Sequence, residues 1–207
     1  VVLGDVLPIV TDPAVAGFDR ERDGKRPSVV AVSGFVQGLA AWQAKATTQA
    51  QLDQWSADAR LSIGLRMRAI RALDVDVAEP AAANRIVDAI YSRLGATLPR
   101  RYRDGTGSCA LLYRIADPPA VLRKGIVWMD GGKVEFLGDG QQLLVAGWHA
   151  KSSQRLQWER EPSTLDDVPA YSMQVIYELY LHLRDLFGTA EAKTRKWGYE
   201  GTLIQRA

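Results

Sequence analysis

The sequence predicts an α+β (mixed α/β) fold, and two observations lead to that class. Segments with strand-like alternation and segments with helix-like periodicity follow one another irregularly, without the regular strand–helix–strand repeat of a doubly wound sheet. Two strand-like runs, 133–137 and 142–146, flank Gly138-Asp139-Gly140, a composition typical of a tight hairpin turn. An antiparallel sheet accompanied by helices is therefore expected.

The first third of the chain contains three predicted elements. Residues 1–30 form a short strand and then a polar loop that ends in Gly24-Lys25-Arg26-Pro27. Residues 47–59 begin with a threonine suited to a helix N-cap and have helical periodicity. The apolar positions of that helix share one face: Leu52, Trp55 and Ala59. Residues 62–77 are predicted to form one or two strands.

The rest of the chain carries stronger signals. A helix is predicted over 80–94, with proline in its first turn and Gly95 as its C-cap. Its buried stripe is Ile86, Ile90 and Leu94. An apolar strand is expected over 108–115 and a long amphipathic helix over 169–187. We expect residues 1–188 to form one domain and 189–207 to form a polar tail. The possible anchors of the tail are Trp197 and Tyr199.

The composition is that of an ordinary globular protein. Its 207 residues are 47% hydrophobic and 24% charged, which suits one large domain or two small lobes that share a core. The formal net charge of +2 excludes a broadly basic, histone-like surface but allows a local basic groove. No run of 18 apolar residues occurs, so neither a membrane span nor a membrane partner is expected.

The cysteine count and the amino-terminal residues indicate the cellular setting. Cys109 is the only cysteine, which excludes an internal disulfide and a cysteine-rich zinc site. The start VVLGDVLPIV lacks a basic segment and is interrupted by Asp5 and Pro8, so no signal peptide is expected. A cytoplasmic setting is the simplest interpretation. Because residue 1 is valine, we expect a trimmed chain or one domain of a longer protein.

Asp74 and Asp76 are the most informative candidate functional residues. They alternate with Leu73, Val75 and Val77, so both carboxylates lie on one face of a strand, about 6.5 Å apart. Carboxylates at that separation can converge on a pair of divalent ions. A lone Asp-x-Asp is more often simply the polar face of a strand. Two acids at the end of an otherwise apolar strand need a partner, however, because burying unpaired charge is costly.

Glu135 supplies a third acid on another predicted strand, between Val134 and Phe136. If that strand lies beside the first, the three carboxylates form one cluster. The alternative is an ordinary solvent-facing glutamate. Three clustered acids without a metal would repel one another, which favours a metal site.

In this order, these segments resemble the prim-pol branch of the archaeo-eukaryotic primase superfamily, in particular its phage and prophage members. The strongest likeness is KVEFLGDGQQLLVAGWHAKSSQRLQWE, residues 133–159. This segment has an acid on a strand, a Gly-Asp-Gly turn, a Gln-Gln pair, Gly-x-His and a closing tryptophan, as in the family. The family's first acidic motif matches Asp74 and Asp76, and its third matches Glu135. The likeness extends over roughly residues 3 to 160.

The resemblance implies a DNA primase/polymerase that transfers nucleotides to a nucleic-acid 3′-hydroxyl in phage or mobile-element replication. The implied fold is a primase-like catalytic domain of two intertwined lobes, with an RRM-like antiparallel sheet flanked by helices. Asp74, Asp76 and Glu135 would be the catalytic residues and would hold two Mg²⁺ or Mn²⁺ ions. The implied substrates are a single-stranded DNA template with its primer, and a dNTP or NTP. A replicative helicase or a separate helical priming domain is the expected partner.

The phosphate-binding side departs from the family. Its second motif usually places a histidine on the strand after a Gly-rich turn, but residues 105–114 contain none. Basic residues are expected to bind the triphosphate instead, because guanidinium and ammonium groups suit phosphate oxygens. These candidates are Arg101, Arg114 and Lys124, with Arg103 a more ordinary surface residue.

His149 matches the family's Gly-x-His and either contacts a phosphate or sugar, or braces its loop. His182, in the last helix, is expected to be a surface or packing residue. The candidates for nucleic-acid contact are Lys25, Arg66 and Arg68. The two arginines alternate on the segment that leads into Asp74, so they are expected to share its open face. Trp42 and Trp55 are candidates for stacking on bases, and packing in the helix core is the role expected of Trp55.

Two rival functions remain open from the sequence. A metal-dependent nuclease uses similar carboxylate-held ions, but the general-base Lys or His spacing of a nuclease is missing. A nucleic-acid-binding module with a decayed active site would explain the absent histidine, whereas the retained carboxylates argue against it.

Overall fold

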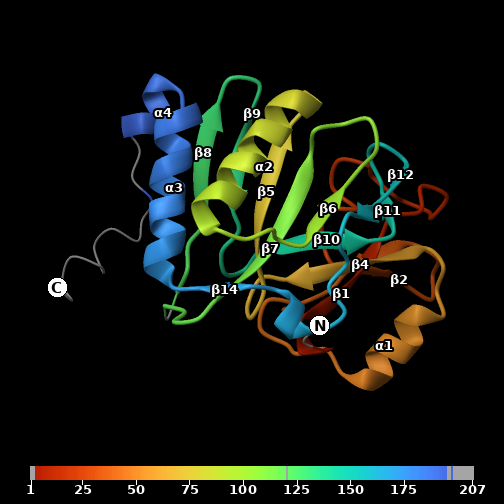
Figure 1. Ribbon diagram of the computed structural model, residues 1–207. Coiled ribbons are helices and arrows are strands. Elements are labelled where there is room, and N and C mark those ends of the chain that lie inside the picture. Colours follow the sequence, from red (N-terminus) through yellow and green to blue (C-terminus); the bar gives the residue numbers. More distant parts are fainter. Residues whose placement is uncertain (1–2, 120, 195–196, 198–207) are drawn as a thin grey trace. The chain divides into compact units, whose positions relative to one another are not determined.

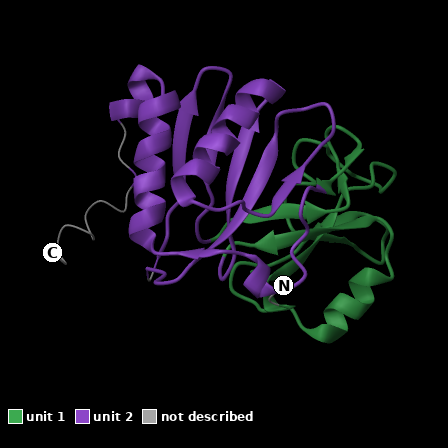
Figure 2. Ribbon diagram, viewed as in Figure 1, with its two compact units in different colours: residues 1–67, 140–157 green, residues 68–139, 158–207 purple. Residues whose placement is uncertain are grey.

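The structure is a computed structural model that describes residues 3–119, 121–194 and 197 (Figure 1). The chain divides into two compact units, and each unit is built from two separate segments (Figure 2). Unit 1 comprises residues 1–67 and 140–157, and unit 2 comprises residues 68–139 and 158–207. The α+β class expected from the sequence is confirmed. Within the described residues, no helix combines the length and apolar character needed to cross a bilayer.

Unit 2 is built around a seven-stranded sheet in the order β13-β6-β7-β5-β9-β8, with the short β14 parallel to the end of β7. The strands are β5 (Arg71–Val77), β6 (Arg100–Tyr102), β7 (Cys109–Ile115), β8 (Gly125–Met129), β9 (Gly132–Phe136), β13 (Gln157–Trp158) and β14 (Ala170–Tyr171). The pairings of β5 with β7 and β9, of β6 with β7 and of β8 with β9 are antiparallel.

One face of this sheet forms the main core. Alternate residues of β5, including Leu73 and Val75, pack with Ile86 and Ile90 of α2 (Pro80–Leu94) and with α3 (Met173–Phe187). Figure 1 shows both helices lying along the sheet. Because strand side chains alternate between faces, residues 74 and 76 of β5 belong to the other face. The core therefore fixes which face presents the candidate site.

The helix boundaries follow from their caps. The Glu79 carboxylate accepts hydrogen bonds from the first turn of α2, and Gly95 ends the helix with a φ of 66°. The predicted helix 80–94 is thus confirmed. The helix expected over 169–187 begins later, with Ser172 as N-cap, because Ala170 and Tyr171 pair with β7 instead. The short helices η2 (Leu165–Asp167) and α4 (Ala190–Thr194) were not predicted.

The expected aromatic anchor Trp197 is buried in the core of unit 2. Its indole lies 5.1 Å from the Phe136 ring and 5.2 Å from the Tyr180 ring, between ring centroids. Its Nε1 donates to the carbonyl of Arg123 at 2.9 Å. Tyr199, the other anchor candidate, lies outside the described residues.

Unit 1 contains a smaller antiparallel sheet in the order β1-β4-β10. Its elements are η1 (Leu3–Asp5), β1 (Val6–Val10), β2 (Ser28–Val30), β3 (Val36–Gly38), α1 (Gln49–Ser56), β4 (Leu61–Arg66), β10 (Gln142–Ala146), β11 (Trp148–His149) and β12 (Gln154–Arg155). Strands β2 and β3 form one hairpin, and β11 and β12 form another. Pro8 fits β1 because that strand is at an edge of its sheet.

The helix expected over 47–59 is shorter than predicted. Thr48 and Gln51 form a reciprocal capping box that starts α1 at Gln49, and the helix ends at Ser56. The helix has no buried residue, and Trp55 is half-buried. Trp55 therefore lies at the surface of unit 1 and is not part of its core.

The predicted hairpin over 133–146 is wrong. Strand β9 pairs with β5 and β8 in unit 2, whereas β10 pairs with β4 in unit 1. Gly138-Asp139-Gly140 is where the chain passes from one unit to the other. The Asp-Gly hairpin turn of this region is Asp130-Gly131, which joins β8 to β9 with Met129 opposite Gly132. Gly131 has a φ of 80°, as such turns require.

The run 62–77 also divides differently from the expectation. Residues up to 66 belong to β4 in unit 1, a bend follows, and β5 begins at Arg71 in unit 2. Arg66 and Arg68 are therefore not on the strand that carries Asp74, and the expectation that they share its open face is wrong.

Candidate active site

Asp74 and Glu135 lie directly opposite each other on the neighbouring strands β5 and β9. Opposed residues on antiparallel strands have Cβ atoms about 4.5–5.5 Å apart and project from the same face. Asp76 follows on that face, two residues along β5 and opposite Lys133. We call this face of the seven-stranded sheet the carboxylate face. The structure thus brings together the three predicted carboxylates on one surface.

Arg101 approaches Asp74 from two strands away. Both residues are in register with Ala110 of β7, whose small side chain lets the arginine extend across it. The Arg101 Nη2 lies 3.8 Å from the Asp74 Oδ1, and the arginine side chain is only 8% exposed. Among the described residues, its buried Nε has no hydrogen-bond partner. Arg101 is therefore held at the carboxylate face with donor capacity to spare.

The electrostatics of Asp74 reflect this crowding. Burial raises the pKa of the Asp74 carboxyl above its ordinary value, the Arg101 guanidinium opposes the rise, and the Glu135 and Asp76 carboxylates add to it. For Arg101, burial lowers the pKa, the Asp74 charge opposes that effect, and the like charge of Arg103 adds to it. The site therefore favours additional positive charge beside Asp74.

Two lysines hold Glu135. The Nζ atoms of Lys124 and Lys133 lie 2.9 Å and 3.3 Å from the same carboxylate oxygen, Oε1. Lys133 also lies over the Trp128 ring, 5.3 Å from its centroid. Lys124 was predicted as a site residue and Lys133 was not. The alternation of Lys133, Val134 and Glu135 already indicates a shared face, so the sequence contained the signal.

The geometry of the loop that carries Lys124 depends on Gly138 and Asp139. The Asp139 carboxylate accepts from the Leu122 N–H at 2.6 Å and pairs with buried Arg71 at 2.7 Å. A Cβ at Gly138 would lie 2.3 Å from the Leu122 carbonyl oxygen, so only glycine allows this approach. The Gly-Asp part of the motif therefore positions the loop that carries Lys124.

Arg114 lies away from the carboxylates. It is four residues beyond Ala110 on β7, roughly 13 Å along the strand from the position opposite Asp74. Its Nε donates to the carbonyl of Val168 at 2.8 Å, and its Nη2 lies 3.9 Å from Asp166. These contacts give Arg114 a structural role beside β14.

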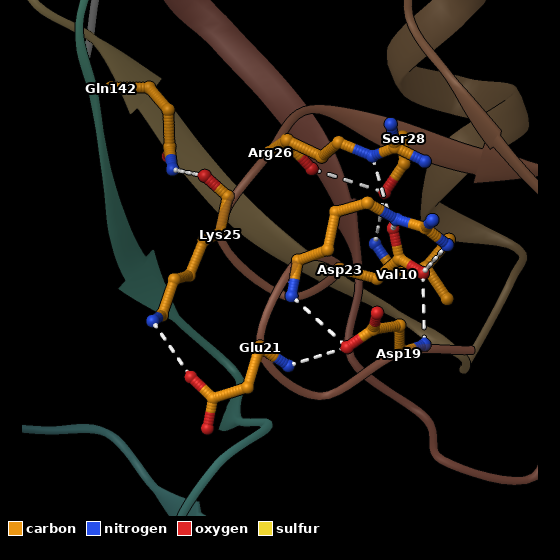
Figure 3. A network of polar contacts seen from close by, with 9 residues as sticks. Val10, Asp19, Glu21, Asp23, Lys25, Arg26, Ser28 and Gln142 are labelled. Carbon is orange, nitrogen blue, oxygen red and sulfur yellow. Dashed lines mark hydrogen bonds and ion pairs between the residues drawn. The ribbon is translucent and has the colours of Figure 1, made fainter.

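The predicted nucleic-acid contacts occupy varied environments. Arg66 is 1% exposed, pairs with Asp5 at 3.3 Å and donates to the carbonyls of Trp42 and Gly4. A buried guanidinium that is held by these contacts cannot meet a nucleic acid, so that prediction is corrected. Arg68 is exposed in the bend between β4 and β5. Lys25 is 56% exposed and lies 3.7 Å from Glu21 (Figure 3).

Two other predicted residues are partly exposed. His149, in β11 of unit 1, contacts Ser152 through its Nδ1 at 2.9 Å, so it helps to fix the turn that follows. His182 is half-buried on α3.

The donor chemistry of the carboxylate face suits divalent cations. Hard carboxylate oxygens are the ligands that Mg²⁺ and Mn²⁺ prefer, and the backbone places three of them on one surface. Within the described ranges, however, no three His, Cys, Asp or Glu side chains are grouped closely enough to hold a metal ion. The lysines and Arg101 neutralise the carboxylates in this conformation. The backbone placement fits a metal site, and the side chains would have to turn toward the ion.

The fold and the site define an α+β protein whose sheet face combines carboxylates with arginine and lysine side chains, groups whose chemistry suits divalent cations and phosphates. The chain belongs to the Prim-Pol family, described as the bifunctional DNA primase/polymerase N-terminal domain, which matches residues 5–171. The resemblance seen in the sequence is thereby confirmed. Its function is of the DNA primase/polymerase type, which implies nucleic-acid and nucleotide substrates. A search of the curated proteins finds no match.

Proposed function

We propose that this protein performs template-directed transfer of nucleotides from a dNTP or NTP to a nucleic-acid 3′-hydroxyl, in phage or mobile-element replication. The observation that carries the proposal is that Asp74 and Glu135 lie opposite each other on adjacent strands, on a face that also bears Asp76. The chain that carries this face belongs to the Prim-Pol family. A replicative helicase or a separate helical priming domain would act with it.

Asp74, Asp76 and Glu135 would hold two Mg²⁺ or Mn²⁺ ions. When bound, such ions lower the pKa of the attacking hydroxyl and neutralise charge on the triphosphate. The Glu135 and Asp76 carboxylates both contribute to the raised pKa of Asp74, and a bound cation would relieve this repulsion between like charges.

Arg101, Lys124 and Lys133 would bind the triphosphate. All three contact a candidate metal ligand, and Arg101 has a buried Nε without a partner among the described residues. Phosphate oxygens can satisfy such donors through charge-assisted hydrogen bonds. Arg114 is left out of this set because its position on β7 and its contact with Val168 separate it from the carboxylates.

Primer extension tests the proposal. A primed template, labelled dNTP and Mn²⁺ are incubated with the wild type and with Asp74→Asn, which keeps the side-chain volume and removes the charge. We expect the extension rate to fall by more than about 100-fold. Mutation of a residue that only orients a metal ligand typically lowers activity by about 10–100-fold, and Asp74 would be a ligand itself. Asp88→Asn, an exposed acid on α2, is the matched control and should extend normally. Undiminished extension by Asp74→Asn would overturn the proposal.

The same assay separates the second candidate, an inactive nucleic-acid-binding module. That candidate is supported by the two lysines that hold Glu135 and by the absence of a histidine from residues 105–114. It predicts binding of the primed template without extension by the wild type. Shortening of the primer would instead identify a nuclease.

A further inference from the structure

A pocket of about 290 Å³ opens on unit 1, and its lining combines an aromatic ring with polar groups. The lining includes Thr11 and Asp12, which follow β1, Ala59 before β4, and Trp148 and His149 of β11. Trp148 is 53% exposed, which is high for so large an apolar side chain. The pocket lies entirely on unit 1, whereas the carboxylate face belongs to unit 2.

The backbone of the pocket is firmly fixed. The Thr11 and Ser62 hydroxyls are 2.6 Å apart, and the Ser62 Oγ accepts from the Trp148 N–H at 2.9 Å. Gly147 has a φ of 99°, and a Cβ there would lie 2.2 Å from the Ser62 Oγ. Only glycine can therefore bring the chain this close to Ser62. The result is an anchored backbone that presents an exposed indole.

The charges of the pocket favour a base over a phosphate. The Asp12 carboxylate, whose Oδ1 accepts from the Ala14 N–H at 2.8 Å, belongs to the lining. Among the described residues, the lining contains no lysine or arginine. A phosphate would be repelled, whereas an exocyclic amino group of a base can donate to the carboxylate. An aromatic ring beside such an acceptor suits a flat ligand that stacks and donates.

One lysine lies on a segment that lines the pocket, and a second lies on a loop packed against that segment. Lys151, in the β11–β12 turn, lies 3.0 Å from Glu21, and Lys25 lies 3.7 Å from the same glutamate (Figure 3 shows Lys25 and Glu21). All three side chains are more than half exposed, so phosphates can compete for the lysines. The two loops are packed together, since a Cβ at Gly24 would lie 2.4 Å from that of Ala150.

We propose that this pocket binds an unpaired base of a single-stranded nucleic acid, with Trp148 stacking on the base and Lys25 and Lys151 contacting the backbone. The combination of an aromatic platform with flanking cations is how proteins hold single strands. The site selects bases with an exocyclic amino group over thymine, because Asp12 accepts a hydrogen bond. This inference rests on the proposed function for its biological role, but the binding it describes needs no catalysis.

Fluorescence anisotropy of a labelled oligo(dC), in EDTA and without nucleotide, tests the proposal. We expect Trp148→Ala to weaken binding by about 5- to 100-fold, the range for the loss of a stacking partner. Trp148→Phe should retain most of the affinity and shows that the site still folds. Phe35→Ala, which removes another exposed aromatic ring of unit 1, should bind like the wild type. Equal binding by Trp148→Ala and Phe35→Ala would overturn the proposal.

Three further measurements test its parts. Lys151→Gln should lower the slope of log affinity against log salt by about 0.7, as expected for one lost phosphate contact on a single strand. Asp12→Asn should narrow the preference for oligo(dC) over oligo(dT). An unchanged slope or an unchanged preference would contradict the assigned contact. Displacement of the oligonucleotide by equimolar free dCMP would show a mononucleotide site and overturn the strand proposal.

The outcome is distinguishable from that of the proposed function. The binding assay contains EDTA and no nucleotide, so it requires neither the metal ions nor the catalysis of the proposed function. If Asp74→Asn extends primers normally while Trp148→Ala binds oligo(dC) weakly, the proposed function is overturned and the proposed base-binding pocket is supported.

Discussion

At the scale of single residues, the most consequential contact is that of Glu135 with two lysines through one oxygen. In this conformation the ammonium groups of Lys124 and Lys133 neutralise the Glu135 carboxylate, as a bound metal ion would. Phosphates and carboxylates compete for the same ammonium groups. A triphosphate that attracts the lysines would therefore release Glu135 toward a cation. On this basis, the binding of nucleotide and of metal should be coupled.

Replacing Lys133 tests the coupling. Lys133→Met keeps an unbranched side chain over Trp128 and removes one positive charge from Glu135. In the absence of nucleotide, we expect Mn²⁺ affinity to rise by about 5-fold, which corresponds to roughly 1 kcal/mol for one nearby like charge. The KM for dNTP should rise, because a phosphate contact is lost. Electron paramagnetic resonance of free Mn²⁺ measures the first effect.

Lys193→Met, an exposed lysine on α4, controls for net charge. If Lys133→Met and Lys193→Met bind Mn²⁺ equally, the lysines do not compete with the ion.

At the scale of secondary-structure elements, the segment after β9 does not form the hairpin turn that its composition suggested. It holds the loop that carries Lys124. Its Asp-Gly pair is typical of a hairpin turn, but Asp139 directs its carboxylate to Leu122 and Arg71. Trp197 supports the same loop through the carbonyl of Arg123. The two residues that directly precede Lys124 are thus both held in place.

Gly138→Ala should displace the loop that carries Lys124. The new Cβ would meet the Leu122 carbonyl, so the backbone of one segment must shift, at a cost of about 1–3 kcal/mol in unfolding free energy. The displaced Lys124 should raise the KM for dNTP. Gly140→Ala is the control for KM, because its new Cβ would have no neighbour within 4 Å, although its φ of 75° gives the alanine a backbone cost of about 1–2 kcal/mol. Thermal unfolding and extension kinetics measure the two effects, and an equal KM in both variants would show that the loop position does not matter.

At the scale of the whole molecule, sequence reasoning succeeded where the information is local. Alternation placed Asp74 and Asp76 on one face, and caps located α2, because both depend on neighbouring residues. It failed where the pairing partner is remote. Nothing near Arg66 shows that the chain leaves one sheet and joins another after residue 67. The hairpin was placed one turn too late because Asp130-Gly131 and Asp139-Gly140 look alike.

Each unit buries apolar residues of its own, and unit 1 also contains a polar network. The core of unit 2 joins its sheet with α2, α3 and Trp197, whereas a separate small cluster in unit 1 consists of Ile9, Leu144 and Leu156. Unit 1 relies in addition on a polar network (Figure 3). In that network the Val10 N–H donates to the Ser28 Oγ, which donates to the carbonyl of Arg26, and Arg26 pairs with Asp23.

The acid stability of unit 1 should depend on Asp23. Burial alone would raise the pKa of Asp23, but hydrogen bonds from Arg22 and the Asp19 N–H, and the Arg26 charge, bring it below its ordinary value. A lowered folded-state pKa contributes stability above the unfolded-state value, near 3.8, and that stability is lost as the pH falls through the lower folded value. Asp23→Asn should therefore cost about 1.5–3 kcal/mol at neutral pH and little in acid. Hydrogen exchange should show β1 and β2 losing protection before β5 and β7 as wild-type protein is acidified. In Asp23→Asn this unit 1 loss should already be present at neutral pH, and an unchanged acid profile would contradict the role of Asp23.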